Sequence, residues 1–212
     1  MEELVSQSKI DLAVAEKETK NKFMEELTTE AIVLRCVPYG ERKNILTLFS
    51  NEGGLLSANS YISLKKRGYL SALCRCNFLL TRKTSDIFQI KDLSPVDLYT
   101  PLRENFARLN CAGFMLKTLL RSQLPSKPSP LLYKLLISYL DELKTSESLP
   151  QLRSSFLLKT LKHEGLYSPT EFFMEAQKLA DVRKFPELAS IEITAEMEKK
   201  IEELFWRNLS FS

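Results

Sequence analysis

Residues 30–83 constrain the fold of this chain most strongly, because they form a run of short apolar and β-branched segments. Near its start, Ile32, Leu34 and Cys36 share one face of an extended segment, as expected of a strand that buries one side. Alternation is clearest at residues 74–83, where apolar side chains face one way and basic ones the other. Further strands are predicted at residues 44–49, 55–62 and 86–93. Five short strands without a helical pattern among them favour a closed sheet.

A closed sheet of five short strands is typical of the OB fold, so we predict an OB-fold barrel. After Tyr99 the apolar spacing becomes helical. A serine or threonine followed by a proline marks three helix starts: Thr100-Pro101, Ser129-Pro130 and Ser168-Pro169. About five helices are predicted, the third ending at Gly165 with a left-handed cap. The first carries Phe106, Leu109, Gly113, Leu116 and Leu120 on one face, where Gly113 is expected to allow close packing by a neighbour.

The fold class is therefore predicted to be α+β, with an N-terminal five-stranded OB-fold barrel followed by an all-helical domain. Residues 29–99 form the predicted barrel, and residues 100–212 form the helical domain, without a zinc site. Residues 1–28 are predicted to be an extension, mobile or helical. This extension mixes Glu and Lys and resembles no secretory signal, and no run of about 18 apolar residues occurs. We therefore expect a cytoplasmic protein without a membrane partner.

Positive charge is concentrated in the predicted barrel. Residues 30–85 hold nine basic and three acidic residues, a balance of +6, although the whole chain carries only +3. The basic residues are Arg35, Arg42, Lys43, Lys65, Lys66, Arg67, Arg75, Arg82 and Lys83. An uneven charge distribution of this kind bears on partners rather than on fold, and a basic barrel face suits a polyanion such as nucleic acid.

Three tyrosines accompany these charges: Tyr39 in the first predicted turn, and Tyr61 and Tyr69 on either side of the basic loop. Exposed aromatic rings on a basic barrel stack on bases, while cations neutralise phosphates, so we predict a nucleic-acid site with weak sequence preference. The alternative is that the tyrosines pack on the rim of the barrel and the lysines only solvate it. A second basic group, Lys117 and Arg121 on the first predicted helix, suits an acidic peptide with an apolar anchor, or is a solvated face.

Signatures of catalysis are missing from the sequence. The only histidine, His163, falls in the last turn of a predicted helix, where a cation offsets the helix dipole. The common nucleotide-binding and acyl-transfer motifs are absent. The four cysteines include a C-x-C pair without a second pair, which disfavours a metal site and fits reduced thiols. We expect a binding protein rather than an enzyme, with no cofactor and no metal.

Several segments together resemble one family. Residues 30–35 (EAIVLR), 38–41 (PYGE), 44–50 (NILTLFS) and 52–54 (EGG) are similar to the N-terminal signature of RecO, the bacterial recombination mediator. The likeness continues more weakly through Phe78, the helix at residues 103–120, the leucine-rich second helix and residues 156–165. It spans roughly residues 30–169.

This resemblance implies an OB-fold barrel joined to a helical domain. It also implies binding of single- and double-stranded DNA, annealing of complementary strands, and loading of RecA with RecR, in a bacterial, nucleoid-associated protein. A further implied partner is the acidic C-terminal tail of single-strand-binding protein. Many RecO-like proteins carry a cysteine-clustered zinc site after the third helix, but no cysteine follows Cys111 here. Ser60-Tyr61 also replaces a common lysine-glycine pair, for which Lys65, Lys66 and Arg67 are the expected substitute.

Two other functions fit the same residues. One is a protein-interaction adaptor whose barrel binds a peptide, and the other is an RNA-binding factor. The adaptor predicts no DNA binding at moderate salt, and the RNA-binding factor predicts a preference for RNA over DNA of equal sequence.

Overall fold

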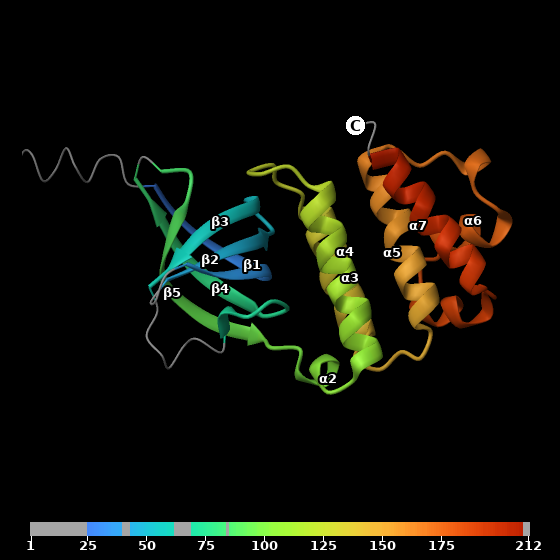
Figure 1. The fold of residues 1–212 in the computed structure, drawn as a ribbon, viewed down its shortest axis with the longest axis horizontal. Coiled ribbons are helices and arrows are strands. Elements are labelled where there is room, and N and C mark those ends of the chain that lie inside the picture. Colours follow the sequence, from blue (N-terminus) through green and yellow to red (C-terminus); the bar gives the residue numbers. More distant parts are fainter. Residues whose placement is uncertain (1–24, 40–42, 62–68, 84, 210–212) are drawn as a thin grey trace, which may run out of the picture.

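The computed structural model describes residues 25–39, 43–61, 69–83 and 85–209. Most of the predicted N-terminal extension lies outside these ranges, as do Arg42, Lys65, Lys66 and Arg67. The strands form one end of the molecule, helices α3 and α4 cross its middle, and α5, α6 and α7 form the other end (Figure 1). This arrangement confirms the predicted fold class.

The barrel consists of β1 (Glu25–Tyr39), β2 (Lys43–Ser50), β3 (Gly54–Ser60), β4 (Arg75–Arg82) and β5 (Phe88–Asp97), closed in the order β1-β2-β3-β5-β4. Strand β1 closes it, because residues 25–32 pair with β4 and residues 31–39 pair with β2. It begins at Glu25, before the alternating residues that predicted the strand, because its polar start is held by pairing with β4. The parallel pair, β3 with β5, completes the ring.

A bulge in β1 changes which way its side chains face. The register of β1 against β2 shifts between Val33 and Arg35, so Leu34 has no partner in β2. Ile32 and Leu34 therefore pack against the helices, whereas Cys36 packs against the barrel interior. The predicted single face of Ile32, Leu34 and Cys36 is wrong for this reason. Val33 lies inside the barrel, so the centre of β1 is buried on both faces.

Two apolar cores result. One fills the barrel and includes Leu46, Phe78 and Phe88. The other joins the outward face of the barrel, through residues such as Phe49, to the helices. The ring of Phe49 lies 5.9 Å from that of Tyr133 on α4, between centroids. Burial of this shared apolar surface is the main force that holds the helices on the barrel.

The helices are α2 (Thr100–Arg103), α3 (Phe106–Ser122), α4 (Pro130–Glu142), α5 (Leu149–Glu164), α6 (Met174–Asp181) and α7 (Ala195–Leu209), with short 3-10 turns η2 (Pro169–Glu171) and η3 (Phe185–Ser190). Helix α5 lies among α3, α4, α6 and α7, and eight of its side chains are buried. No helix in the described ranges is long and apolar enough to cross a membrane.

Helix α3 buries only part of the predicted face, since Leu116 is buried and Leu120 packs against the core. Cys111, Ala112, Met115 and Leu119 are buried, whereas Phe106 is 83% exposed and Leu109 is also exposed. A Cβ added at Gly113 would meet nothing within 4 Å, so the expected close packing there is wrong. The error arises because α3 is apolar around most of its circumference, and spacing alone does not orient such a helix.

Of the three predicted helix starts, two coincide with the starts of α2 and α4, whereas Ser168-Pro169 begins the 3-10 turn η2 and α6 starts only at Met174. Proline occupies the first turn of α2, α4 and η2, yet no preceding side chain caps the helix there. The Ser129 hydroxyl instead lies 3.1 Å from Nε2 of His163. Side-chain caps come from Asn105, which accepts from the N–H of Arg108, and from Thr194, which accepts from the N–H of Met197. The predicted cap of α5 is confirmed, since Gly165 has φ of 73°.

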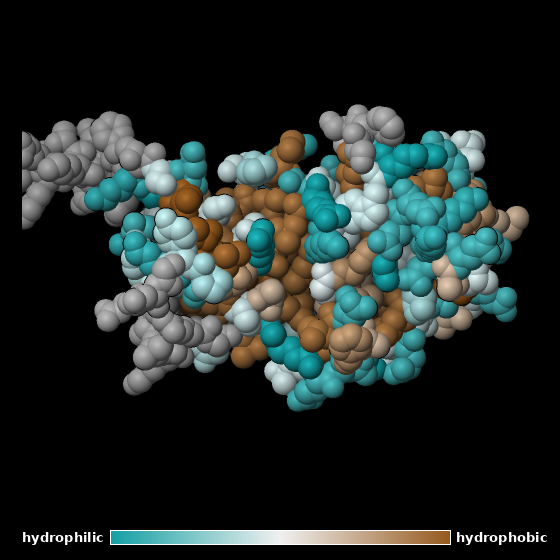
Figure 2. All heavy atoms as spheres, viewed as in Figure 1, coloured by the Kyte–Doolittle hydropathy of each residue, from teal (hydrophilic) through white to brown (hydrophobic). Residues whose placement is uncertain are grey.

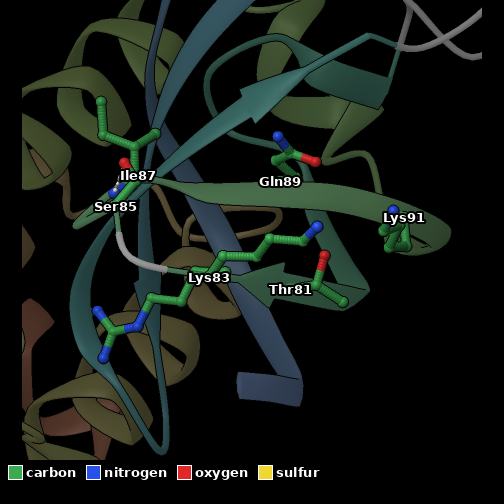
Figure 3. Close-up of a pocket in the computed structure, with 7 residues that line it drawn as sticks. Thr81, Lys83, Ser85, Ile87, Gln89 and Lys91 are labelled. Carbon is green, nitrogen blue, oxygen red and sulfur yellow. Dashed lines mark hydrogen bonds between the residues drawn. The ribbon is translucent and has the colours of Figure 1, made fainter. Parts of the chain in front are cut away.

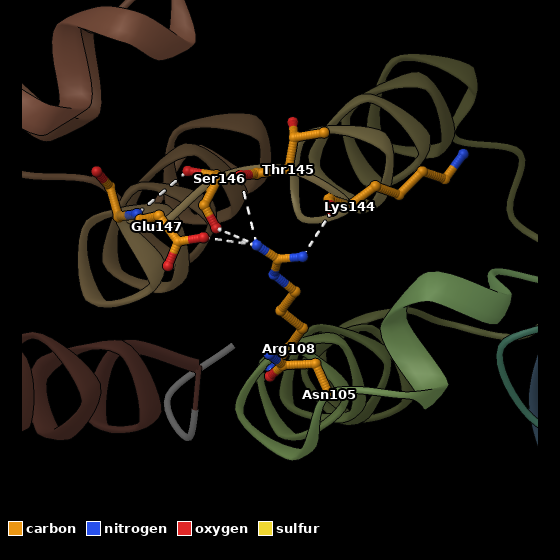
Figure 4. A network of polar contacts seen from close by, with 7 residues as sticks. Asn105, Arg108, Lys144, Thr145, Ser146 and Glu147 are labelled. Carbon is orange, nitrogen blue, oxygen red and sulfur yellow. Dashed lines mark hydrogen bonds and ion pairs between the residues drawn. The ribbon is translucent and has the colours of Figure 1, made fainter.

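Arg108 ties α3 to the loop between α4 and α5 (Figure 4). Its guanidinium donates to the carbonyl oxygens of Lys144 at 2.8 Å and Thr145 at 3.4 Å, and to the carboxylate of Glu147 at 2.7 Å. The planar fork of an arginine reaches several acceptors at once, and one flexible ammonium does not replace it. This contact fixes the loop against the helix that supports the barrel.

Candidate nucleic-acid interface

Two exposed tyrosines and a lysine gather where β1, β2 and β3 end. Tyr39 is the last residue of β1 and pairs in register with Lys43 at the start of β2. Tyr61 directly follows β3, and its ring centroid lies 4.9 Å from Nζ of Lys43. Tyr39 is 62% exposed and Tyr61 is 58% exposed. We call Tyr39, Lys43 and Tyr61 the tyrosine cluster. Its rings lie open to solvent beside a cation, as stacking on a nucleobase requires.

Arg35 extends this cluster along the outer surface of β1. It is exposed and pairs in register with Thr47 of β2, directly after the bulge. Without the bulge, strict alternation would place the residue after Leu34 inside the barrel. The bulge thus gives β1 one more side chain for the helices and still leaves Arg35 in solvent.

A second basic group lies on the hairpin between β4 and β5. Arg82 forms an ion pair with Glu25 at 2.6 Å, and its guanidinium carbon lies 4.5 Å from the centroid of Phe88. Lys83 follows it and is exposed. Lys91 on β5, which the sequence prediction left out, is exposed near them. The alternation at residues 88–91 is the sequence pattern that could have identified Lys91, because Phe88 and Ile90 are buried while Gln89 and Lys91 are exposed.

Arg75 lies apart from both groups, at the junction of barrel and helices. It pairs in register with Ile32 of β1 and Asp97 of β5, and it is half-buried. Its Nε is buried and makes no hydrogen bond in the described part of the chain. The predicted DNA-binding set is therefore brought together only in part. Tyr39, Lys43 and Tyr61 cluster, and Arg35 lies four residues before Tyr39 on β1. Arg82 and Lys83 share the hairpin, whereas Arg75 faces the helices.

Asp97 and Lys144 cross the same junction. Nζ of Lys144 lies 2.6 Å from Asp97 and 2.6 Å from Asp141. Burial opposes ionisation of Asp97, but hydrogen bonds from Lys144 and from the N–H of Tyr99, with the charges of Lys144 and Arg75, outweigh it and lower the pKa of this carboxyl. The positive charge of Arg75 thus acts on Asp97 within the fold.

The remaining predicted residues divide by position. Arg42, Lys65, Lys66 and Arg67 lie outside the described ranges, so their place relative to the tyrosine cluster stays a prediction. Tyr69 is half-buried and packs against the barrel core. Its ring is thus less open to a base than those of Tyr39 and Tyr61.

The predicted partner residues lie on the exposed side of α3. Lys117 is exposed, and the guanidinium carbon of Arg121 lies 5.2 Å from the ring of Trp206 on α7. Phe106 and Leu109 are exposed on the same helix, and Leu124 follows it. On the face viewed in Figure 2, apolar surface gathers where the barrel meets the helices, whereas the far helical end is mostly hydrophilic.

The four cysteines form no disulfide with one another, and three of them are buried. Burial raises the pKa of Cys111 to about 12; burial and the neighbouring Cys74 raise that of Cys76 to about 12. Thiols of this kind are poor nucleophiles at neutral pH. Within the described ranges, no group of three or more His, Cys, Asp or Glu side chains is arranged to hold a metal ion.

The closed barrel of five strands and the helices that follow it define an OB-fold protein with an appended helical domain. Comparison with known proteins narrows this class. The family model described as "Recombination protein O N terminal" matches residues 24–99, which contain the whole barrel. The model described as "Recombination protein O C terminal" matches residues 103–171, from the end of α2 to η2. The chain belongs to the RecO family.

Curated relatives agree, and each is named DNA repair protein RecO. The protein of Anaeromyxobacter sp. (strain K) is 28% identical over 148 residues, which cover 68% of this chain and 58% of the relative. That of Chlamydia pneumoniae is 25% identical over 148 residues, 68% of this chain and 59% of the relative. That of Geobacter metallireducens is 31% identical over 137 residues, 63% of this chain and 56% of the relative. The chain spans less than two thirds of the length of these relatives.

Proposed function

We propose that this chain is a non-enzymatic, DNA-binding mediator of recombinational repair. In this proposal it binds single- and double-stranded DNA on the barrel and anneals complementary strands. It also assists RecA loading together with RecR. Membership of a family of DNA repair proteins supports the repair role. The barrel contact is the part that rests on the geometry of this chain.

The tyrosine cluster is the observation that carries the DNA contact. Lys43 lies against the ring of Tyr61 and beside Tyr39, and both rings are more than half exposed. A strand laid across this surface stacks bases on the rings, and Arg35 and Lys43 meet its phosphates. Each stacked base contributes about 1–3 kcal/mol and tolerates any sequence. The expected result is tight binding with weak sequence preference.

A partner contact on α3 completes the proposal. Lys117 and Arg121 lie on the same helix as exposed Phe106 and Leu109. An acidic peptide with an apolar anchor complements this surface, and the family resemblance implies the acidic C-terminal tail of single-strand-binding protein as the partner. We therefore propose that the tail contacts α3 while DNA occupies the barrel.

Strand annealing tests the function directly. The full chain is mixed with complementary labelled oligonucleotides, with and without single-strand-binding protein, and the rate of duplex formation is followed by energy transfer. A mediator accelerates annealing in both mixtures. An adaptor leaves the rate unchanged and still binds single-strand-binding protein. An RNA-binding factor binds RNA more tightly than DNA of equal sequence in the parallel binding assay. Either result contradicts the proposal.

A further inference from the structure

A recess opens between β4 and β5 near their hairpin (Figure 3). Its volume is about 270 Å³. It is lined by Thr81, Arg82, Lys83, Ser85, Ile87, Gln89 and Lys91. We call these residues the hairpin recess. Three of them are cationic, none is acidic, and two hydroxyls and an amide supply neutral hydrogen-bond donors.

Two of its cations are available to a ligand. Lys83 and Lys91 are exposed, and neither takes part in an ion pair within the described ranges. Arg82 differs, because Glu25 pairs with it and Phe88 lies beneath it. The lining charge of +3 therefore falls to +2 when Glu25 is included. In Figure 3 the Lys83 side chain extends between the strands, with Thr81 and Gln89 on either side.

The recess adjoins the surface proposed for DNA. Gln89 in its lining pairs in register with Asn59 of β3, two residues before Tyr61. A strand that lies over the tyrosine cluster thus passes within reach of the hairpin. A flat basic face is enough to hold internal phosphates, each a diester with one negative charge. The hairpin recess is hollowed and carries a net charge of +2 with Glu25 included, so it suits a ligand with more charge and more free oxygens.

We propose that the hairpin recess binds the terminal phosphate monoester of a DNA strand. A monoester carries close to two negative charges at pH 7 and three acceptor oxygens, because its second pKa is about 6. The ammonium groups of Lys83 and Lys91 neutralise it, and Thr81, Ser85 and Gln89 offer further donors. This inference rests on the proposed function and adds to it a preference for strand ends that carry phosphate.

Binding of oligonucleotides with defined ends tests this preference. The full chain is titrated with one sequence in three forms, carrying a 5′-phosphate, a 3′-phosphate or hydroxyls at both ends, with the label internal. We expect one phosphorylated form to bind at least tenfold more tightly than the hydroxyl form at pH 7.5. Lowering the pH to 5 reduces that ratio, because the monoester then carries about one charge. Inorganic phosphate is expected to displace the phosphorylated form from the protein more readily than the hydroxyl form.

Variants assign the effect to the recess. The double variant Lys83→Gln/Lys91→Gln removes two charges. It is expected to bring the ratio of affinities for the phosphorylated and hydroxyl forms to about one, while the hydroxyl form still binds. The matched control, Lys184→Gln with Lys200→Gln, removes two exposed charges from the helical end and leaves the ratio intact. Equal affinities of wild type for all three forms overturn the inference and leave the proposed function standing. Failure to bind any form overturns both.

Discussion

Tyr39 and Tyr61 are the side chains on which a base-stacking contact depends most. Both rings are largely exposed, so replacing either with alanine removes little packing and leaves the fold intact. Tyr39→Ala and Tyr61→Ala are each expected to weaken binding of single-stranded DNA by about 1–3 kcal/mol. Duplex DNA keeps its bases stacked internally, so its affinity falls less. Fluorescence anisotropy with matched single- and double-stranded oligonucleotides measures the difference.

Tyr69→Ala serves as the comparison, because this ring is half-buried against the barrel core. It is expected to lower the free energy of unfolding and to change DNA affinity less than either exposed ring. A loss of single-strand affinity as large as that of Tyr61→Ala contradicts the distinction drawn between exposed and packed tyrosines.

Two glycines in the helices have opposite roles. Gly113 lies mid-helix in α3 with open space around its Cα, so Gly113→Ala is expected to stabilise the protein by about 0.5–1 kcal/mol. Gly165 ends α5 with φ of 73°, a conformation that costs alanine about 1 kcal/mol or more. Gly165→Ala is therefore expected to destabilise. Urea denaturation of both variants gives the sign of each change in the free energy of unfolding. Destabilisation by Gly113→Ala would contradict the open space found around Gly113.

Alternation of apolar residues predicted the strands because most of them bury one face, as β4 does with Cys76, Phe78 and Leu80. It failed at β1, where the bulge at Leu34 and pairing with two strands set the face and the start. Helical spacing likewise oriented α3 only in part. These features depend on contacts between segments far apart in the chain, and no local pattern records them.

Site residues show the same division. Tyr39, Lys43 and Tyr61 come together because the registers of β1 with β2 and of β2 with β3 join them. The sequence placed Tyr39 in a turn and Tyr61 beside a loop, but it did not predict these registers. Arg75 has the same sequence character as Arg35, yet it lies beneath the helices beside Asp97. Which outer face of a barrel the helices cover is a property of tertiary packing, so charge counting alone does not separate these two arginines.

The joint between barrel and helices carries a pH dependence. The pKa of Asp97 is lowered in the folded state, so its contribution to stability is present above its ordinary value of about 3.9 and is lost as the pH falls through the lower folded value. Asp97→Asn is expected to be less stable than wild type at pH 6 and to lose less stability between pH 6 and pH 3. Urea denaturation at several pH values measures this.

Asp181→Asn is the control, since that carboxyl is 72% exposed although it pairs with Lys162. Its stability is expected to follow wild type across the pH range, because exposed pairs contribute little. An acid sensitivity of Asp97→Asn equal to that of wild type contradicts the role given to the Asp97–Lys144 contact.

The most direct test of a cationic DNA contact on the barrel is the salt dependence of affinity for single-stranded DNA. The dissociation constant is measured by anisotropy at several salt concentrations for wild type, for Arg35→Gln/Lys43→Gln/Lys83→Gln, and for the helical control Lys178→Gln/Lys184→Gln/Lys200→Gln. Each lost phosphate contact lowers the slope of log affinity against log salt by about 0.7. The barrel variant is expected to lose about 2 from its slope and the control nothing. Equal slopes for wild type and the barrel variant, or an equal loss in the control, contradict DNA binding on the barrel.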